Sequence, residues 1–105
     1  MPFELYFLPP YGRCLKHLGN KEKRIARLVV SALLEYFHSN SPTGNPYMIP
    51  VGGRAYRLVF KKLDGAVWEA YIENHVRVLT RLDKHRHFLV FAGNHDQVRQ
   101  FLKEN

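Results

Sequence analysis

A short run of alternating apolar and polar positions opens the chain. The apolar members of this run are Phe3, Leu5 and Phe7, and Glu4 and Tyr6 lie between them. Because successive side chains of a strand point to opposite faces, the alternation predicts a strand. The strand should end at Pro9 and Pro10, since proline cannot donate to a sheet ladder. A short helical turn is expected over residues 11–18, and Gly19 is expected to end it.

The next apolar positions recur every three or four residues, which is the spacing of one helix face. They are Ile25, Leu28, Val29, Ala32, Leu33, Tyr36 and Phe37. Asn20 precedes them and is expected to cap a long helix. The opposite face of this helix carries Lys23, Arg24, Arg27 and Glu35. We expect the helix to lie on a sheet, with its cationic face either simply in solvent or in contact with a partner.

The composition then changes. Proline and glycine recur through residues 39–54, so this stretch is expected to form a loop and neither a helix nor a central strand. Four strands are expected after it, over residues 54–62, 67–73, 75–82 and 87–92. The reversals between them are marked by Asp64-Gly65, Glu73-Asn74 and Asp83-Lys84. These strands should form an antiparallel meander.

A final short helix is expected at the end of the chain. Asn94 and Gln97 have the spacing of a capping box, and the apolar residues that follow are Val98, Phe101 and Leu102. The sequence therefore predicts one domain over residues 1–105 with an α+β fold. Its expected form is a twisted antiparallel sheet with two N-terminal helices packed on one face and a short C-terminal helix.

Charge adds information about partners. The chain has 16 Lys and Arg against 9 Asp and Glu, a formal net charge of +7 at pH 7. This excess favours a polyanionic partner, and the alternative is a basic surface without one. The single cysteine, Cys14, excludes an internal disulfide. With no signal segment and no apolar run near the roughly 20 residues that a membrane span needs, we expect a soluble cytoplasmic protein without a membrane partner.

Several kinds of site can be set aside on spacing. The chain has no glycine-rich phosphate loop followed by Lys-Ser or Lys-Thr, no paired Cys-x-x-Cys and no His-Glu-x-x-His. The nearest approach to a metal site is His85-Arg86-His87, where Lys84 and Arg86 would repel a cation. We expect no metal and no cofactor. This segment should be a solvated hairpin tip or, in a nucleic-acid-binding protein, a contact with phosphate.

Two residues suit the cleavage of a phosphodiester without a metal. Arg77 lies on an expected strand, and His95 lies where the last strand gives way to a helix. When a 2′-hydroxyl attacks its own 3′ phosphate, the phosphorane needs fixed positive charge and the leaving oxygen needs a proton. A guanidinium is permanently cationic, and an imidazole can hold a donatable proton near neutral pH. The alternatives are a surface salt bridge for Arg77 and a helix cap for His95.

Residues 57–98 resemble the C-terminal half of the RelE/ParE toxin superfamily. The matching residues are Leu63, Gly65, Trp68, Ile72, Arg77 and Val78. The spacing from Trp68 to Arg77 and from Arg77 to His95 is similar to that of the YoeB/RelE-like mRNA interferases. The resemblance implies a toxin of a type II toxin-antitoxin pair. Such a toxin is an endoribonuclease that cleaves mRNA on the ribosome by metal-independent 2′-hydroxyl attack, and a cognate antitoxin protein covers its basic site.

The candidate site residues fall into two groups. The catalytic candidates are Arg77, His95, Lys61, Lys62 and Glu69, and the substrate-binding candidates are Arg57, Arg81, Arg86, Tyr71 and Asp96. By alternation, either Lys61 or Lys62 should share a face with Arg77. Tyr71, with Trp68 and Phe91, could stack on bases, although core packing is the alternative for Trp68 and Phe91.

The chain departs from the family pattern at two positions. Members of this branch often carry a Glu where this chain has Arg57, and a Tyr where it has Asp96. Glu69 or His95 would then have to act as the base, and the alternative for Glu69 is an exposed cross-strand partner of a cation. Two other functions stay open: a ParE-like toxin that acts on DNA gyrase without nuclease activity, and a catalytically inactive RNA-binding or regulatory domain.

Overall fold

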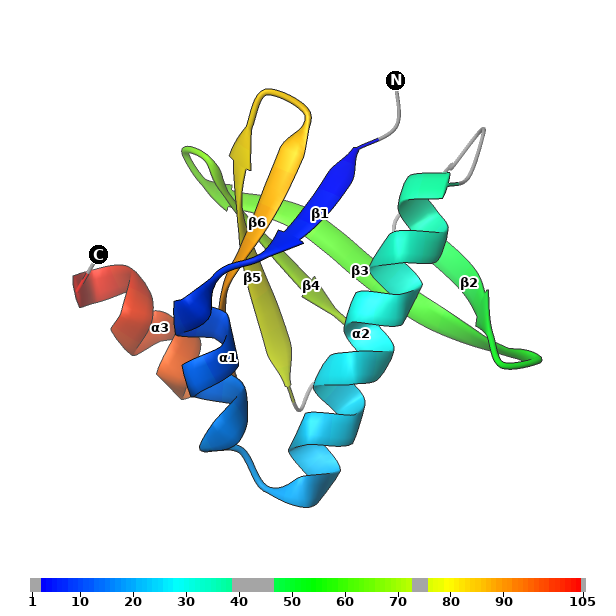
Figure 1. Ribbon diagram of the computed structural model, residues 1–105, viewed down its shortest axis with the longest axis horizontal. Helices are drawn as coiled ribbons and strands as arrows, with labels where there is room; N and C mark the ends of the chain where they lie inside the picture. Colours follow the sequence, from blue (N-terminus) through cyan, green and yellow to red (C-terminus); the bar gives the residue numbers. More distant parts are fainter. Residues whose placement is uncertain (1–2, 39–46, 73–75, 105) are drawn as a thin grey trace.

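The computed structural model describes residues 3–38, 47–72 and 76–104 (Figure 1). Along the chain, these residues form β1 (Glu4–Phe7), α1 (Pro9–Lys16), α2 (Asn20–His38), β2 (Tyr47–Val51), β3 (Arg54–Asp64), β4 (Val67–Tyr71), β5 (Arg77–Asp83), β6 (Arg86–Gly93) and α3 (His95–Glu104). In this part of the chain, no helix combines the length and the apolar character that crossing a membrane requires.

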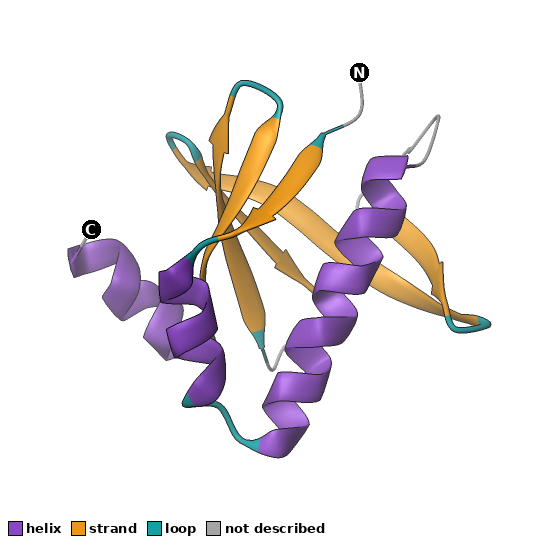
Figure 2. Ribbon diagram, viewed as in Figure 1, coloured by secondary structure: helices purple, strands orange, loops and turns teal. Residues whose placement is uncertain are grey.

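The described strands form one six-stranded sheet in the order β1-β6-β5-β4-β3-β2 (Figure 2). Strands β2 to β6 pair with their neighbours in antiparallel fashion, and β3 to β6 form the meander that was expected. Strand β1 instead runs parallel to β6, with Glu4 opposite Arg86 and Phe7 opposite Leu89. The prediction of an antiparallel sheet is therefore wrong, and the sheet is mixed. Alternation along β1 identifies a strand, but it carries no information about the neighbour or its direction.

Strand β2 corrects a second prediction, because it lies in the stretch 39–54 that was expected to be a loop. Strand β2 is at the edge of the sheet. An edge strand tolerates a proline such as Pro50, because on its outer side no neighbouring strand accepts the backbone N–H that proline lacks. Gly52 and Gly53 close the β2–β3 hairpin with φ angles of +60° and +80°, which other residues rarely adopt. The rest of the expected loop, residues 39–46, and the expected turn at 73–74 lie outside the described residues.

The helix ends differ from the predictions in two places. Helix α1 begins at Pro9 instead of residue 11, because a proline fits the first helical turn, where its missing N–H has no intrahelical partner. Helix α2 begins at Asn20, so Gly19 precedes the helix and its carbonyl accepts the N–H of Lys23 at 2.9 Å. Gly19 therefore occupies the capping position that was expected for Asn20.

The capping box of α3 is confirmed. The N–H of Gln97 donates to Oδ1 of Asn94, and the N–H of Asn94 donates to Oε1 of Gln97, both at 2.8 Å. These two bonds satisfy donors at the helix start and fix the path of the chain from β6 into α3.

Each face of the sheet carries an apolar layer. The larger layer joins α1 and α2 to one face, called here the α2 face, through strand residues Leu58, Phe60, Ala70, Val78 and Leu89. In Figure 1 these two helices lie in front of the sheet. The smaller layer lies on the opposite face, called the α3 face, where Val67, Leu79 and Val90 pack against Val98 of α3. Phe91 stacks on Phe101 in this layer.

His87 corrects the prediction of a solvated hairpin tip around His85-Arg86-His87, because its exposed fraction is 0%. Its ring stacks on Phe37 at 5.3 Å and meets Trp68 edge-on at 5.8 Å between ring centroids. Nδ1 lies 2.8 Å from the hydroxyl oxygen of Thr80, and Nε2 has no hydrogen-bond partner among the described residues. Burial lowers the pKa of His87 to about 4, so the ring is neutral in the folded protein near pH 7.

Acid should destabilise the protein through His87. Burial lowers the pKa of this residue from 6.5 to about 4, so the unfolded chain gains a proton at higher pH than the folded protein. The free energy of unfolding should therefore fall as the pH drops from 6.5 to about 4, by about 3 kcal/mol at roughly 1.4 kcal/mol per pKa unit. Denaturant unfolding of the wild type and of His87→Phe across this pH range measures the contribution.

Carboxylates also titrate in this pH range, and they are present in both proteins. The difference between the two unfolding free energies therefore reports the contribution of His87. His17→Gln is the matched control, because this exposed side chain lies outside the ion pairs and the apolar layers of the described residues. An equally steep loss of stability in His87→Phe would show that His87 does not cause it.

Candidate functional site

A buried ion pair joins the central strands at the α3 face. Nη1 of Arg77 lies 2.6 Å from Oε1 of Glu69, and the two side chains are only 12% and 5% exposed. Glu69 stands opposite Leu79 in the β4–β5 register, so Arg77 is its diagonal neighbour on the same face. Glu69 was expected to be a catalytic residue, with an exposed cross-strand partner of a cation as the alternative, and the alternative for Arg77 was a surface salt bridge. The pair exists, but it is buried.

Tyr71 lies against the same guanidinium. The central carbon of the Arg77 guanidinium is 4.1 Å from the centroid of the Tyr71 ring, and Nζ of Lys61 is 5.8 Å from that centroid. Both distances are within the range of a cation–π contact. Arg77, Glu69, Tyr71 and Lys61 together are called here the Arg77 cluster.

Strand register explains why these residues meet. Lys61 is the partner of Glu69 in the β3–β4 pair, so both side chains lie on the α3 face with Arg77. Lys62 is instead the partner of Trp68, whose ring packs on Phe60 in the core of the α2 face. Of the two lysines, Lys61 therefore shares the face of Arg77.

The guanidinium keeps donors that Glu69 does not use. An arginine has five N–H donors, and Nε of Arg77 is buried with no hydrogen-bond partner among the described residues. A cation held by one bond to a carboxylate and one contact with a ring is fixed in position. Because Nε is buried, an anion could meet the guanidinium only through the 12% of the side chain that is exposed.

The other arginines of the predicted site lie at increasing distances from the Arg77 cluster. Arg57 is exposed on β3, four residues before Lys61 on the same alternating face. Arg81 is exposed on β5, about 13 Å along the strand from Arg77. Arg86 lies at the far end of the sheet, about 20 Å away by strand length, where its Nε is 3.8 Å from Oε1 of Glu4. Arg86 is therefore not part of the cluster.

His95 is exposed at the first position of α3. Gly93, two residues earlier, is the strand partner of Arg77, so the register brings the start of α3 to the end of β5 that carries the cluster. The capping role that was the alternative for His95 belongs to Asn94. Asp96 is exposed in the first turn of α3, where a carboxylate favours the helix dipole.

A hollow of about 360 Å³ borders the start of α3 and the connection between α1 and α2, with His17, Glu22 and Asn94 among its lining residues.

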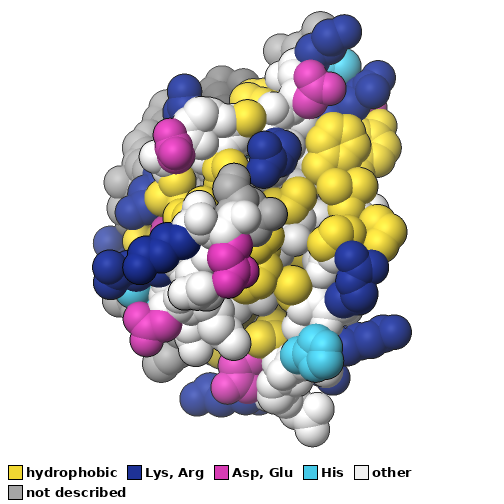
Figure 3. Space-filling model, turned by 90° about the vertical axis from the view of Figure 1, so that its left-hand side faces the viewer, with side chains coloured by type: hydrophobic (Ala, Val, Ile, Leu, Met, Phe, Trp, Pro, Cys, Tyr) yellow, Lys and Arg dark blue, Asp and Glu magenta, His cyan; other side chains and the backbone are white. Residues whose placement is uncertain are grey.

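Within the described residues, no group of three or more His, Cys, Asp and Glu could hold a metal ion. Lys and Arg side chains occur at several places around the flank drawn in Figure 3, with hydrophobic side chains exposed between them.

Sequence reasoning named every member of the Arg77 cluster, but it did not identify the bond between Arg77 and Glu69. The signal that could have found it is the alternation of Val67, Glu69 and Tyr71 along one strand, which places a carboxylate between two residues of an inward face. Sequence reasoning also omitted Lys21 from the cationic face of α2. In the structure, Lys21 lines a hollow together with Lys23, Arg24 and Arg27.

Neither the protein-family models nor the curated proteins with which the chain was compared gave a match. The resemblance of residues 57–98 to the RelE/ParE superfamily therefore stays a prediction. The geometry of the Arg77 cluster is the basis for any functional assignment.

Removing either member of the buried ion pair should be costly. Arg77→Met leaves a buried carboxylate without its partner and should destabilise the protein by about 3 kcal/mol or more, whereas Glu69→Leu combined with Arg77→Met should restore much of the loss. A double-mutant cycle, measured by urea unfolding, gives the coupling free energy.

The control cycle combines Glu4→Gln with Arg86→Gln, whose wild-type side chains are 49% and 51% exposed. Its coupling should stay below about 1 kcal/mol, because solvent screens exposed ion pairs. If the coupling between Glu69 and Arg77 is no larger than in this control, the pair does not hold the two strands together.

Proposed function

We propose that this protein is an endoribonuclease that binds RNA on the α3 face of its sheet and cleaves it without a metal. The observation that carries the proposal is the guanidinium of Arg77, which is held 2.6 Å from a buried carboxylate and keeps 12% of its side chain exposed. A cation fixed in position at a sheet face is suited to a phosphate, and even more to the phosphorane that forms during cleavage.

Each member of the Arg77 cluster has a role in this proposal. Arg77 donates hydrogen bonds to the scissile phosphate. Glu69 is a positioning residue, because its side chain is 5% exposed and already bonded to Arg77. Lys61 is exposed on the neighbouring strand and adds a second positive charge. Tyr71 presents an aromatic ring on which a base can stack.

The proposed reaction is a transesterification. The 2′-oxygen of one nucleotide loses its proton to water and forms a bond to the adjacent phosphorus, and the bond from that phosphorus to the 5′-oxygen of the next nucleotide breaks. His95 gives the leaving oxygen a proton. The products are a 2′,3′-cyclic phosphate and a 5′-hydroxyl. Positive charge from Arg77 and Lys61 stabilises the phosphorane, which carries more negative charge than the substrate.

The biological setting that we propose is a toxin-antitoxin pair, with mRNA on the ribosome as the substrate. This part is supported by the resemblance of residues 57–98 to RelE/ParE toxins and by the net charge of +7. An acidic antitoxin that covers the Arg77 cluster would block RNA by occupying its cations. Growth arrest with altered DNA supercoiling and no new RNA ends would instead support the gyrase-binding alternative.

Lys61 and Lys62 provide a matched pair for testing the site. Lys61→Ala should slow cleavage of a short single-stranded RNA by about 10²-fold, because it removes one charge from the phosphorane. Lys62→Ala changes the net charge equally on the opposite face and should change the rate less than about threefold. Single-turnover kinetics with purified protein, read as cyclic-phosphate and 5′-hydroxyl ends, measures both rates.

Equal losses in the two variants would mean that overall charge, and not the Arg77 cluster, drives the reaction. RNA binding by the wild type without any cleavage would reject the nuclease and support the inactive RNA-binding alternative.

The proton donor can be tested through the pH dependence of cleavage. If His95 protonates the leaving oxygen, the wild-type rate should decline at alkaline pH, where an imidazole has no proton to give. His95→Gln should lower the rate and abolish this decline, while RNA affinity stays within about twofold of the wild type. A single-turnover pH–rate profile with parallel binding measurements distinguishes the roles. A decline that persists in His95→Gln would exclude His95 as the acid.

A further inference from the structure

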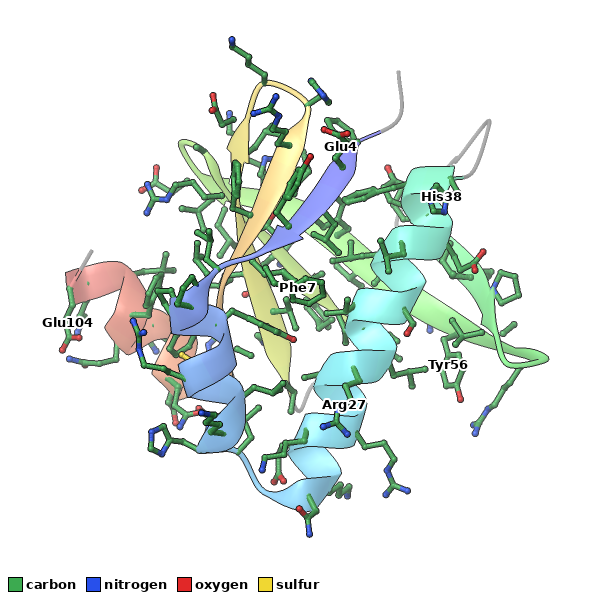
Figure 4. All side chains as sticks on the ribbon, in the orientation of Figure 1. Glu4, Phe7, Arg27, His38, Tyr56 and Glu104 are labelled. Atoms are coloured by element: carbon green, nitrogen blue, oxygen red, sulfur yellow. The ribbon has the colours of Figure 1, made fainter. Side chains whose placement is uncertain are left out.

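Basic side chains surround a shallow hollow on the first two turns of α2. The hollow has a volume of about 550 Å³ and is lined by Asn20, Lys21, Lys23, Arg24 and Arg27. Figure 4 labels Arg27 on this part of α2. The four cations, called here the α2 basic patch, span about 9 Å along the helix.

The position of these cations is unfavourable for the helix itself. Positive charges near a helix N-terminus oppose the helix dipole, and like charges three or four residues apart repel each other. The dipole favours an acidic residue in the first turn, and α2 has Glu22 there as α3 has Asp96. In α2, however, Lys21 and Lys23 flank this carboxylate, so the first turn keeps a net positive charge and bears an electrostatic cost.

Among the residues that the structure describes, no ion pair relieves this cost. Among the described residues, ion pairs join Glu69 to Arg77, and Glu4 to His85 and Arg86, and none includes a member of the α2 basic patch. Glu22 is the acidic residue in the first turn of α2. A set of cations that is costly and without such partners is better explained by a negatively charged ligand than by helix stability.

The α2 basic patch is separate from the proposed cleavage site. Helix α2 packs on the α2 face, whereas the Arg77 cluster lies on the α3 face. The patch is therefore a second surface on a different face of the sheet, although Glu22, between Lys21 and Lys23, lines a hollow with Val76 and Asn94 at the end of the sheet beside Arg77 and His95.

We propose that the α2 basic patch binds the phosphate backbone of double-helical RNA. The residues that line the hollow include no aromatic side chain, and single-stranded nucleic acid is generally held by stacking its bases on aromatic rings. Duplex RNA is bound mainly through its backbone and shape, which cations alone can serve. A membrane surface fits less well, because the apolar residues of α2, such as Val29 and Leu33, are buried in the core.

The choice of RNA over DNA as the ligand rests on the proposed function. The inference that the patch binds a phosphate backbone does not. A protein with cations on both faces of its sheet would hold a structured RNA through its double-helical parts, while a single-stranded segment reaches the Arg77 cluster. The α2 basic patch therefore implies that the natural substrate is presented within a folded RNA.

The test compares two charge reversals of equal size. Arg24→Glu with Arg27→Glu changes the patch, and Arg99→Glu with Lys103→Glu makes the same change at exposed positions of α3. Affinity for a 20-base-pair RNA duplex is measured from 0.05 to 0.3 M salt. At 0.15 M, charges farther from the RNA than a Debye length of about 8 Å are largely screened. The patch variant should bind at least about tenfold more weakly at 0.15 M, with a log–log salt slope smaller by about two units.

The control variant should lose less than about threefold in affinity for the RNA duplex at 0.15 M salt. Equal losses in the two variants, or no binding of the RNA duplex by the wild type, would overturn the proposal. So would equal or tighter binding of a DNA duplex of the same sequence, or of polyglutamate. Arg24→Gln with Arg27→Gln removes the charges without reversing them and should still lose affinity with an unchanged melting temperature, which excludes misfolding as the cause.

The same variants separate this proposal from the proposed function. The patch variant should cleave a short single-stranded RNA at the wild-type rate. If no protein cleaves that RNA and the patch variant alone loses duplex affinity, the nuclease proposal fails and the duplex-binding surface stands. If the patch variant keeps its duplex affinity and loses cleavage, the α2 basic patch belongs to the cleavage site and the present proposal is wrong.

Discussion

The arrangement of this protein depends on how far each face of its sheet is covered by helices. Helix α2 has 19 residues and packs along one face, whereas α3 has 10 and packs against Val67, Leu79 and Val90 on the other. The α3 face is thus covered by the shorter helix, which begins at the end of the sheet that carries Arg77. On this face an ion pair at 2.6 Å joins Glu69 to Arg77 beside the apolar layer. The candidate site therefore combines a less covered sheet face with a buried ion pair.

The two faces solve the problem of a buried polar group in different ways. On the α2 face, His87 is neutral, surrounded by aromatic rings and in contact with the hydroxyl of Thr80. On the α3 face, the buried carboxylate of Glu69 is paired with the guanidinium of Arg77 at 2.6 Å. A neutral ring can remain in an apolar core, whereas a buried carboxylate requires a cation beside it. Only the second solution leaves a fixed positive group at a sheet face that can meet a ligand.

The cations of this chain differ in how firmly they are held, and this separates two kinds of electrostatic contact. Arg77 is fixed by a carboxylate and a ring, which suits the stabilisation of charge that develops at one atom. Arg24 and Arg27 are exposed on long flexible side chains, which suits a backbone with repeated charges. The net charge of +7 describes both groups without distinguishing them.

The sequence by itself determined the kinds of the other described elements but not β2, because a strand, a helix face and a capping box each arise from contacts between residues close in the chain. The alternation at β1 and the pair Asn94 and Gln97 are examples. It named the residues of the candidate site, but not their contacts. The parallel pairing of β1 with β6, the edge position that admits Pro50 and the burial of His87 were decided by the tertiary structure. Alternation assigns side chains to two faces, but only packing against helices far away in the sequence decides which face is buried and which cations are left to bind a ligand.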